Sequence, residues 1–194
     1  MKVLLIQPPS VTDWSRRIFA HEPLALEDVG AGLKLDGHDV QVLDARFDPD
    51  VEGKFRQWQP EVVGLTAFTV PAPWVKRTAE RLKAIAPHLL LVGGGHHATV
   101  RPADFNSPAI NAVVIGEGVF TLRELLAKRQ AGQPFDSIPG LALHHRLGGL
   151  RPYGWRDSLR ILRHTPEIMR TIRNGHLDCN GHADARRVNK PIST

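Results

Sequence analysis

The residues best suited to chemistry in this chain stand together after an apolar run. Residues 89–92 are Leu-Leu-Leu-Val, residues 93–95 are three glycines, and His96, His97 and Thr99 follow. A strand buried on both faces reads as a continuous apolar run, and glycines after it let the backbone turn tightly or approach a ligand. Imidazole and hydroxyl groups placed there can bind a metal, hold a polar ligand or satisfy backbone groups. The pattern predicts a functional site at the end of this strand.

A second stretch repeats the arrangement. The apolar residues 112–115 lead into Gly116, Glu117 and Gly118, and a helix-like segment follows. Two strands that end in glycine-bearing loops indicate an open α/β sheet, in which ligands bind at the carboxyl ends of the strands. Glu117 could serve as a general base, but its place before a predicted helix favours a capping role.

The histidines and the cysteine form no convincing metal site. His96 and His97 are adjacent, so in an extended chain they point to opposite sides, and no carboxylate or cysteine stands near them at ligand spacing. We therefore expect them to serve a ligand-binding loop or the backbone. His176, Cys179 and His182 supply three potential zinc ligands without a fourth close by. A single cysteine also excludes an intramolecular disulfide and an iron–sulfur cluster held by this chain alone.

Alternating strand-like and helix-like segments predict the scaffold. Strands are expected at residues 2–7, 40–44, 62–66, 89–92 and 112–115, and helices at residues 24–35, 51–58, 73–86 and 120–130. Parallel strands require crossover helices, and right-handed crossovers favour a doubly wound sheet. Residues 140–145 and 147–150 read as a hairpin with a glycine turn, either an addition to the sheet edge or the start of a connector. The predicted fold is an α/β, doubly wound, five-stranded parallel sheet with flanking helices and a C-terminal hairpin.

Length and composition narrow the class of protein. The 194 residues suit one α/β domain with an appendage, and 42% hydrophobic residues is ordinary for a soluble globular chain. No apolar run reaches the roughly 20 residues of a membrane span, and the start is too short for a secretory signal. We therefore expect a cytoplasmic protein without membrane contact.

Charge is distributed unevenly along the chain. The net charge of +5 arises in residues 151–194, because residues 1–150 carry equal numbers of basic and acidic side chains. A nucleic-acid-binding domain should carry a basic face, which argues against nucleic acid as a partner. The predicted organisation is an α/β domain over 1–137, a linker hairpin over 138–154 and a basic, irregular, partly disordered tail over 155–194.

Five motifs, in order and in register, resemble those of a known family. They are Val3-Leu4-Leu5-Ile6-Gln7-Pro8-Pro9, Val63-Gly64-Leu65-Thr66-Ala67-Phe68-Thr69, Val92-Gly93-Gly94-Gly95-His96-His97-Ala98-Thr99, Ile115-Gly116-Glu117-Gly118 and Ile138-Pro139-Gly140-Leu141-Ala142. Each motif alone is weak, because glycine-rich strand ends are common in α/β proteins. Together they make the first 150 or so residues similar to the amino-terminal cobalamin (B12)-binding domain of the B12-dependent radical-SAM protein family.

The resemblance implies a flavodoxin-like (Rossmann-like) fold that binds cobalamin. The corrin would lie over the carboxyl ends of the strands, and the nucleotide tail would insert beside the sheet. By motif match, the lower face of the corrin would meet Gln7, Pro8 and Pro9. The slot for the tail would be lined by Thr66, Phe68 and Thr69. The tail would be approached by Gly94, Gly95, His97, Thr99, Gly116, Glu117 and Gly118. Glycines suit this role because a bulky planar ligand needs close approach by the backbone.

The chain departs from B12 proteins that supply a histidine to cobalt. Asp36-Gly37-His38-Asp39 begins like an Asp-x-His-x-x-Gly motif, but residue 41 is glutamine, and the motif belongs after the first strand. His38 therefore reads as a turn residue. The loop after the first strand, Pro8 to Ile18, contains no histidine. If cobalamin binds, we expect the base-off form without a histidine ligand from that loop.

The resemblance also implies a limit on catalysis. The radical-SAM half of the family carries a Cys-x3-Cys-x2-Cys run, whereas Cys179 stands alone here. The leading hypothesis is a cobalamin-binding module, truncated before a catalytic iron–sulfur domain or acting with a separate radical-SAM partner, and not a methyltransferase or cyclase by itself. The alternatives are a flavodoxin-like domain that binds a flavin or nucleotide, and a non-catalytic interaction or remnant protein. Gln7-Pro8-Pro9-Ser10 is a poor phosphate loop, because prolines lack N–H donors.

Overall fold

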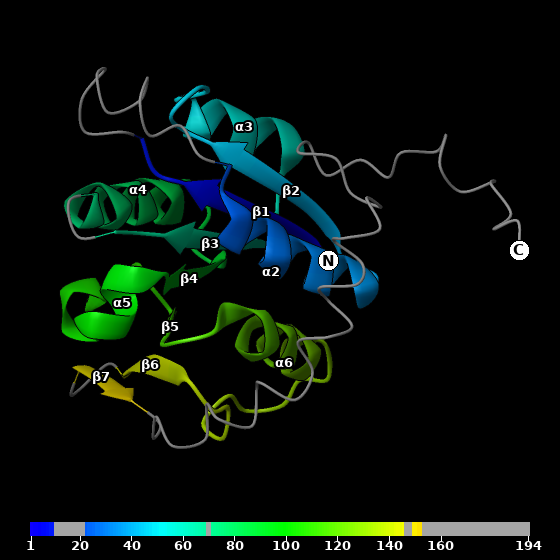
Figure 1. The fold of residues 1–194 in the computed structure, drawn as a ribbon, viewed down its shortest axis with the longest axis vertical. Coiled ribbons are helices and arrows are strands. Elements are labelled where there is room, and N and C mark those ends of the chain that lie inside the picture. Colours follow the sequence, from blue (N-terminus) through cyan, green and yellow to red (C-terminus); the bar gives the residue numbers. More distant parts are fainter. Residues whose placement is uncertain (10–21, 69–70, 146–148, 153–194) are drawn as a thin grey trace, which may run out of the picture.

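The computed structural model describes residues 1–9, 22–68, 71–145 and 149–152. A single sheet organises this part of the chain, with strand order β2-β1-β3-β4-β5-β6-β7 (Figure 1). Its parallel strands are β1 (Lys2–Gln7), β2 (Asp39–Asp44), β3 (Val62–Thr66), β4 (Leu90–Gly94) and β5 (Ala112–Val114). The order 2-1-3-4-5 is the flavodoxin-like variant of the doubly wound sheet, as predicted.

Helices cover both faces of the sheet (Figure 1). Helices α2 (Leu24–Leu35) and α6 (Gly118–Gln130) cover one face. The other face carries α3 (Val51–Trp58), α4 (Ala72–Ile85), the short α5 (His96–Val100) and the 3-10 turn η1 (Pro102–Phe105). In the described residues, no helix is both long enough and apolar enough to serve as a membrane span.

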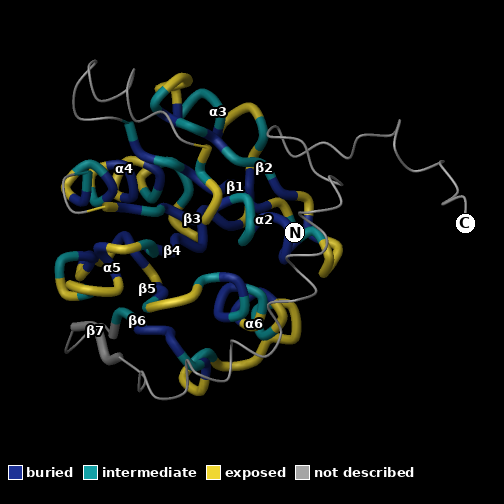
Figure 2. The backbone as a smooth tube through the Cα atoms, viewed as in Figure 1, coloured by how far each residue is buried: buried dark blue, intermediate teal, exposed yellow. Residues whose placement is uncertain are grey.

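The central strands form because their side chains are apolar on both faces. In β1, Val3 to Ile6 are at most 1% exposed (Figure 2). Val3 and Leu5 pack into the core beneath α2 and α6, whereas Leu4 and Ile6 pack into the core beneath α3 and α4. Successive side chains of a strand point to opposite faces, so a continuous apolar run fills two cores at once.

Helices α2 and α6 touch each other as well as the sheet. A Cβ on Gly32 would lie 2.8 Å from Cγ1 of Val119 and 3.2 Å from Cδ of Arg123, so only glycine allows this close approach. One turn further along α2, the guanidinium of Arg123 donates to both carboxylate oxygens of Asp36, at 2.7 and 2.6 Å. The carboxyl-terminal part of α2 is thus joined to the amino-terminal part of α6.

The predicted hairpin extends the sheet at its β5 edge. Strand β6 (Leu141–His145) pairs antiparallel with β5, and β7 (Gly149–Pro152) pairs antiparallel with β6. Several element bounds differ from the sequence-based prediction, and β4 runs on to Gly94, into glycines that were expected to form a loop. Residues 96–100 form α5 where a loop was expected, and α6 begins at Gly118, two residues earlier than predicted. The predicted tail, residues 155–194, lies outside the described residues.

Candidate functional site

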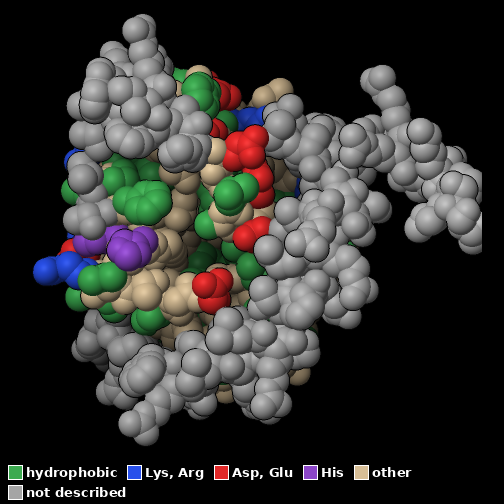
Figure 3. Space-filling model, in the orientation of Figure 1, with side chains coloured by type: hydrophobic (Ala, Val, Ile, Leu, Met, Phe, Trp, Pro, Cys, Tyr) green, Lys and Arg blue, Asp and Glu red, His purple; other side chains and the backbone are tan. Residues whose placement is uncertain are grey.

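A cavity of about 520 Å³ opens at the carboxyl end of the central strands, between α2 and α6. Figure 3 shows this face of the molecule, where several acidic side chains border the hollowed region. The lining comes from both helices, four strands and the loops after them: Leu5, Ala25, Leu26, Asp28, Val29, Gly64, Leu65, Thr66, Val92, Gly93, Gly94, Gly95, His96, Thr99, Val114, Gly116, Glu117, Gly118, Val119 and Leu122.

Glycines form part of the floor of this cavity. Val62 packs beneath α2 and α6, so the alternation of β3 turns Gly64 and Thr66 to the same face. Thr66 pairs with Gly94 of β4 in the parallel register. A Cβ on Gly94 would lie 3.7 Å from Cβ of Val114 and, chain neighbours aside, within 4 Å of no other atom of the described residues, so it would project into the space. The sheet therefore has open space above Gly94, whereas a Cβ on Gly64 would lie 2.8 Å from Cδ2 of Leu5.

The walls of the cavity are apolar and come from the two helices. Leu26 and Val29 of α2 line one side, and Val119 and Leu122 of α6 line the other. The helices stay close at this end too, because a Cβ on Gly118 would lie 3.4 Å from Cγ2 of Val29. The space between them is a narrow slot above the sheet.

Two glycine loops are tied together at the mouth. The hydroxyl of Thr99 accepts a hydrogen bond from the backbone N–H of Gly116 at 2.9 Å and donates to the carbonyl of Gly95 at 3.1 Å. Gly95 has a φ of 94°, and a Cβ there would collide with the hydroxyl of Thr66. This position requires glycine for its conformation and for its closeness to β3.

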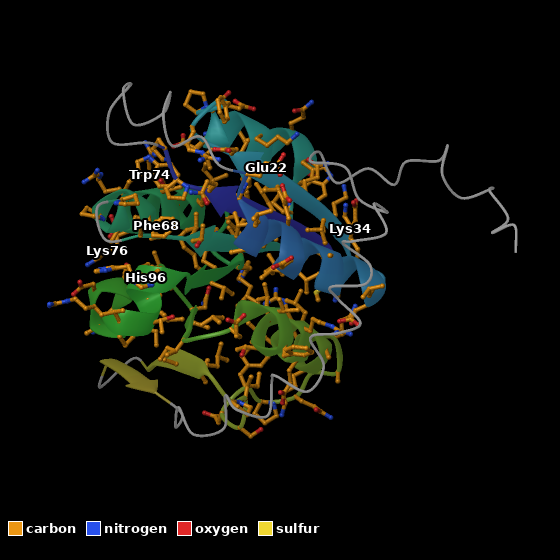
Figure 4. All side chains as sticks on the ribbon, viewed as in Figure 1. Glu22, Lys34, Phe68, Trp74, Lys76 and His96 are labelled. Carbon is orange, nitrogen blue, oxygen red and sulfur yellow. The ribbon has the colours of Figure 1, made fainter. Side chains whose placement is uncertain are left out.

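The adjacent histidines have different surroundings. His97 is 4% exposed, and its Nε2 lies 2.9 Å from Oδ2 of Asp104. Its backbone N–H donates to the backbone carbonyl of Ala67. It anchors α5 to the end of β3 and does not line the cavity. His96 is exposed, lines the cavity, and has its ring 6.4 Å from that of Phe68 (Figure 4). Because residues 96–100 are helical, the two imidazoles face solvent and core respectively.

Acidic side chains of α2 and α6 meet at the mouth. Burial and the neighbouring Glu117 raise the pKa of Asp28, and both residues line the cavity. Burial, together with Glu22 and Asp28, raises the pKa of Glu27, whose Oε1 is buried without a hydrogen-bond partner among the described residues. Glu117 occupies the N-cap position of α6, but its side chain accepts no capping hydrogen bond. The predicted capping role is therefore wrong, and the carboxylate belongs to the cavity.

The other predicted site residues are divided between the cavity and its surroundings. Seven of them line the cavity: Thr66, Gly94, Gly95, Thr99, Gly116, Glu117 and Gly118. Their predicted contact with a nucleotide tail stays a prediction. Gln7, Pro8, Pro9 and Phe68 lie at the same sheet edge but outside the lining, and Thr69 lies outside the described residues. Sequence reasoning missed Gly64 and the helical wall residues. Gly64 left a signal, a glycine inside an apolar strand, which often marks close backbone approach.

His38 lies far from the cavity, at the amino-terminal ends of the strands. It precedes β2, whose first residue pairs with Lys2, and its Nδ1 lies 3.4 Å from the amino-terminal nitrogen of Met1. Burial and the adjacent amino terminus lower the pKa of His38. The residue is a buried turn residue, consistent with the sequence-based interpretation. Within the part that the structure describes, no group of three or more His, Cys, Asp or Glu side chains could hold a metal ion.

Comparison with known proteins agrees with this geometry. The B12 binding domain family matches residues 17–126. An uncharacterised methyltransferase of Pyrococcus horikoshii is 31% identical over 149 residues, covering 73% of this chain and 32% of that protein. An anaerobic magnesium-protoporphyrin IX monomethyl ester cyclase of Synechocystis is 30% identical over 151 residues, covering 73% and 30%.

A solved structure shares the fold. The radical S-adenosylmethionine methyltransferase TsrM of Kitasatospora setae, with cobalamin and a [4Fe-4S] cluster bound, superposes with a TM-score of 0.61 and 28% identity, covering 79% of this chain and 29% of that one. The chain thus spans about a third of the length of these relatives. It belongs to the B12-binding domain family, of the kind found in B12-dependent radical-SAM proteins.

Proposed function

We propose that this chain binds cobalamin in the base-off form, with the corrin over the carboxyl ends of the strands and the nucleotide tail in the cavity between α2 and α6. The observation that carries the proposal is the glycine floor. Gly94 leaves the sheet without side-chain cover, and at Gly64 only the side chain of Leu5 lies close to the backbone among the described residues. The slot between the two apolar helix walls opens at the carboxyl ends of the strands, where flavodoxin-like folds bind ligands.

The residues present fit the chemistry of the cofactor. The flat aromatic base of the tail suits a narrow apolar slot, whose burial contributes about 25 cal/mol per Å² of apolar surface. At the mouth, the hydroxyl of Thr66 suits the phosphate or ribose of the tail. The hydroxyl of Thr99, whose O–H is donated to Gly95, keeps one lone pair that can accept from a ribose hydroxyl. The carboxylates of Asp28 and Glu117 suit the amide side chains of the corrin. When bound, the cofactor supplies a cobalt centre that can carry a methyl group. The chain holds and orients it.

The histidines of the described residues support the base-off, histidine-free form. His97 is buried outside the cavity lining, and His38 lies at the amino-terminal end of the strands. His96 is the histidine that reaches the cavity, and among the described residues its imidazole has no hydrogen-bond partner. A metal-ligating histidine almost always donates its second ring N–H to a partner that fixes its orientation. His96 therefore lacks the support expected of a cobalt ligand.

We further propose that catalysis needs a radical-SAM domain besides the residues of this chain. The chain has one cysteine, and an iron–sulfur cluster of the usual kind takes several cysteine thiolates. The relatives are two methyltransferases and a cyclase, and each is about three times as long as the matched region. In this account the chain presents cobalamin at the open strand edge, where a partner domain meets it.

A titration tests the binding proposal. Purified protein is titrated with hydroxocobalamin and methylcobalamin, with FMN as the control for a flavodoxin-like site. We expect saturable binding, a shift of the absorption spectrum to the base-off form and a raised melting temperature, since a ligand that binds only the folded state stabilises it. The same spectrum is expected for the variant His96→Ala. Spectra and melting temperatures that stay unchanged at ligand excess would overturn the proposal, and binding of FMN alone would favour the flavin alternative.

A further inference from the structure

The cavity lining changes in polarity from its mouth to its interior. Five lining side chains are polar. Thr66 is the last residue of β3, His96 and Thr99 lie in α5 just after β4, and Glu117 follows β5. The fifth, Asp28 of α2, lies near Glu117. The other side chains of the lining are apolar: Leu5, Leu65, Val92 and Val114 from the strands, and Ala25, Leu26, Val29, Val119 and Leu122 from the helices, with Gly64 in the floor. A ligand that enters base-first therefore passes from polar groups into an apolar slot.

The backbone beneath the slot offers few further partners. Gly64 lies in β3 between two parallel neighbours and pairs with Leu5 of β1 on one side and Val92 of β4 on the other. The N–H and C=O groups of a central strand are used within the sheet, so they do not turn toward a ligand above it. Among the described residues, the side chains at this floor, Leu5, Val92 and Val114, offer a polar atom no hydrogen-bond partner.

We propose that this slot selects corrinoids by the polarity of their lower base, accepting a benzimidazole and rejecting a purine. The inference rests on the proposed function, because it concerns the same cavity. The ring edge of dimethylbenzimidazole that enters first carries two methyl groups, which gain from burial. An adenine of similar size carries ring nitrogens and an exocyclic amine there, and each loses its hydrogen bonds to water without replacement.

The expected discrimination is large. A buried polar group left without a partner weakens binding by about tenfold or more. Adenine brings more than one such group, so we expect the dissociation constant of the adenine-bearing corrinoid to exceed that of cobalamin by about 100-fold. Cobinamide has no nucleotide tail. It gains nothing from burial of a benzimidazole, but it also has no unpartnered polar groups of an adenine in the slot, so it should bind with intermediate affinity.

Equilibrium binding of three corrinoids tests the inference. Hydroxocobalamin, its adenine-bearing analogue and cobinamide are titrated separately into the full chain, with absorbance and calorimetry as readouts. The expected order of affinity is cobalamin, cobinamide, adenine analogue. Equal affinity for cobalamin and the adenine analogue would overturn the selectivity while leaving the proposed function intact. Binding of none of the three would overturn both.

A matched pair of variants links the selectivity to the slot. Val114→Thr places a hydroxyl in the cavity wall at nearly constant volume, and we expect it to narrow the preference for cobalamin over the adenine analogue by about tenfold. Val40→Thr makes the same change at a buried strand valine of the same core, outside the cavity, and should leave the preference unchanged. Val119→Thr is a second wall variant should Val114→Thr not fold. A preference that is the same in the folded wall variant and the control would refute the role of the slot.

Discussion

Replacing Gly94 by alanine adds one methyl group to the cavity floor without disturbing the protein around it. The new Cβ would lie 3.7 Å from Cβ of Val114, an ordinary van der Waals contact, and apart from its chain neighbours no other atom in the described part of the chain lies within 4 Å of it. The φ of Gly94 is not in the left-handed region, so alanine adopts the same backbone. The unfolded protein is less flexible with alanine than with glycine at this position. We therefore expect the free energy of unfolding to stay equal or to rise by up to about 1 kcal/mol.

Cobalamin binding should respond in the opposite direction. A methyl group inserted into a filled, well-packed space costs about 1–3 kcal/mol, which raises the dissociation constant by about 5- to 150-fold. The assays are calorimetric titration with hydroxocobalamin for affinity and urea unfolding of the free protein for stability. Opposite changes in the two quantities would place the ligand against Gly94.

Gly30→Ala is the matched control for this experiment. It also adds one methyl to a glycine with ordinary room, 3.6 Å from Cγ1 of Val40, but on α2 outside the cavity lining. We expect its affinity for cobalamin to equal that of the wild type. An unchanged affinity in Gly94→Ala, or an equal loss in both variants, would refute the reasoning that the ligand occupies the glycine floor.

Three further substitutions test the charges and contacts around the site. Asp28→Asn should raise the melting temperature at neutral pH. Burial and the neighbouring Glu117 raise the pKa of Asp28, so its ionisation destabilises the folded state. The gain in melting temperature should vanish below pH 3.8, the pKa of the unfolded state, where Asp28 of the wild type is neutral. Asp36→Asn should lose about 1 kcal/mol at neutral pH. The hydrogen bond to Arg123 lowers the pKa of Asp36, so this loss should persist above pH 3.8 and disappear as the pH falls through the lowered value, which a series of urea melts would show. His97→Leu should reduce the free energy of unfolding by about 1–3 kcal/mol and leave the absorption spectrum of bound cobalamin unchanged; a changed cobalt spectrum would contradict the structural role of this imidazole.

The strands could be predicted from the sequence because each leaves a local signal. Val3 to Ile6 and Val62 to Leu65 are apolar runs of strand length, and prolines stop or precede them. The predicted family and the flavodoxin-like fold are confirmed, since motifs at strand ends keep their order and spacing. Helix α5 could not be predicted, because five residues are too few to display a helical period.

The cavity walls could not be predicted because they depend on which helices become neighbours. Leu26 and Val29 look like ordinary core residues of an amphipathic helix, as does Leu122. The close contact of Gly32 with Val119 brings α2 and α6 together, and sequence periodicity shows neither the pairing nor the slot that it leaves. The contact between the buried His97 and the half-exposed Asp104 depends likewise on the 3-10 turn after α5.

The most direct test of the central claim is the electron paramagnetic resonance spectrum of cob(II)alamin bound to this chain. In free cob(II)alamin at neutral pH the benzimidazole nitrogen coordinates cobalt and splits its signal. With the tail in the slot and His96 not a ligand, the bound spectrum should lose the nitrogen splitting. A spectrum identical to that of the free cofactor would show that the tail has not left the cobalt. Nitrogen splitting that persists in bound protein and disappears in His96→Ala would identify that imidazole as the ligand and contradict the account.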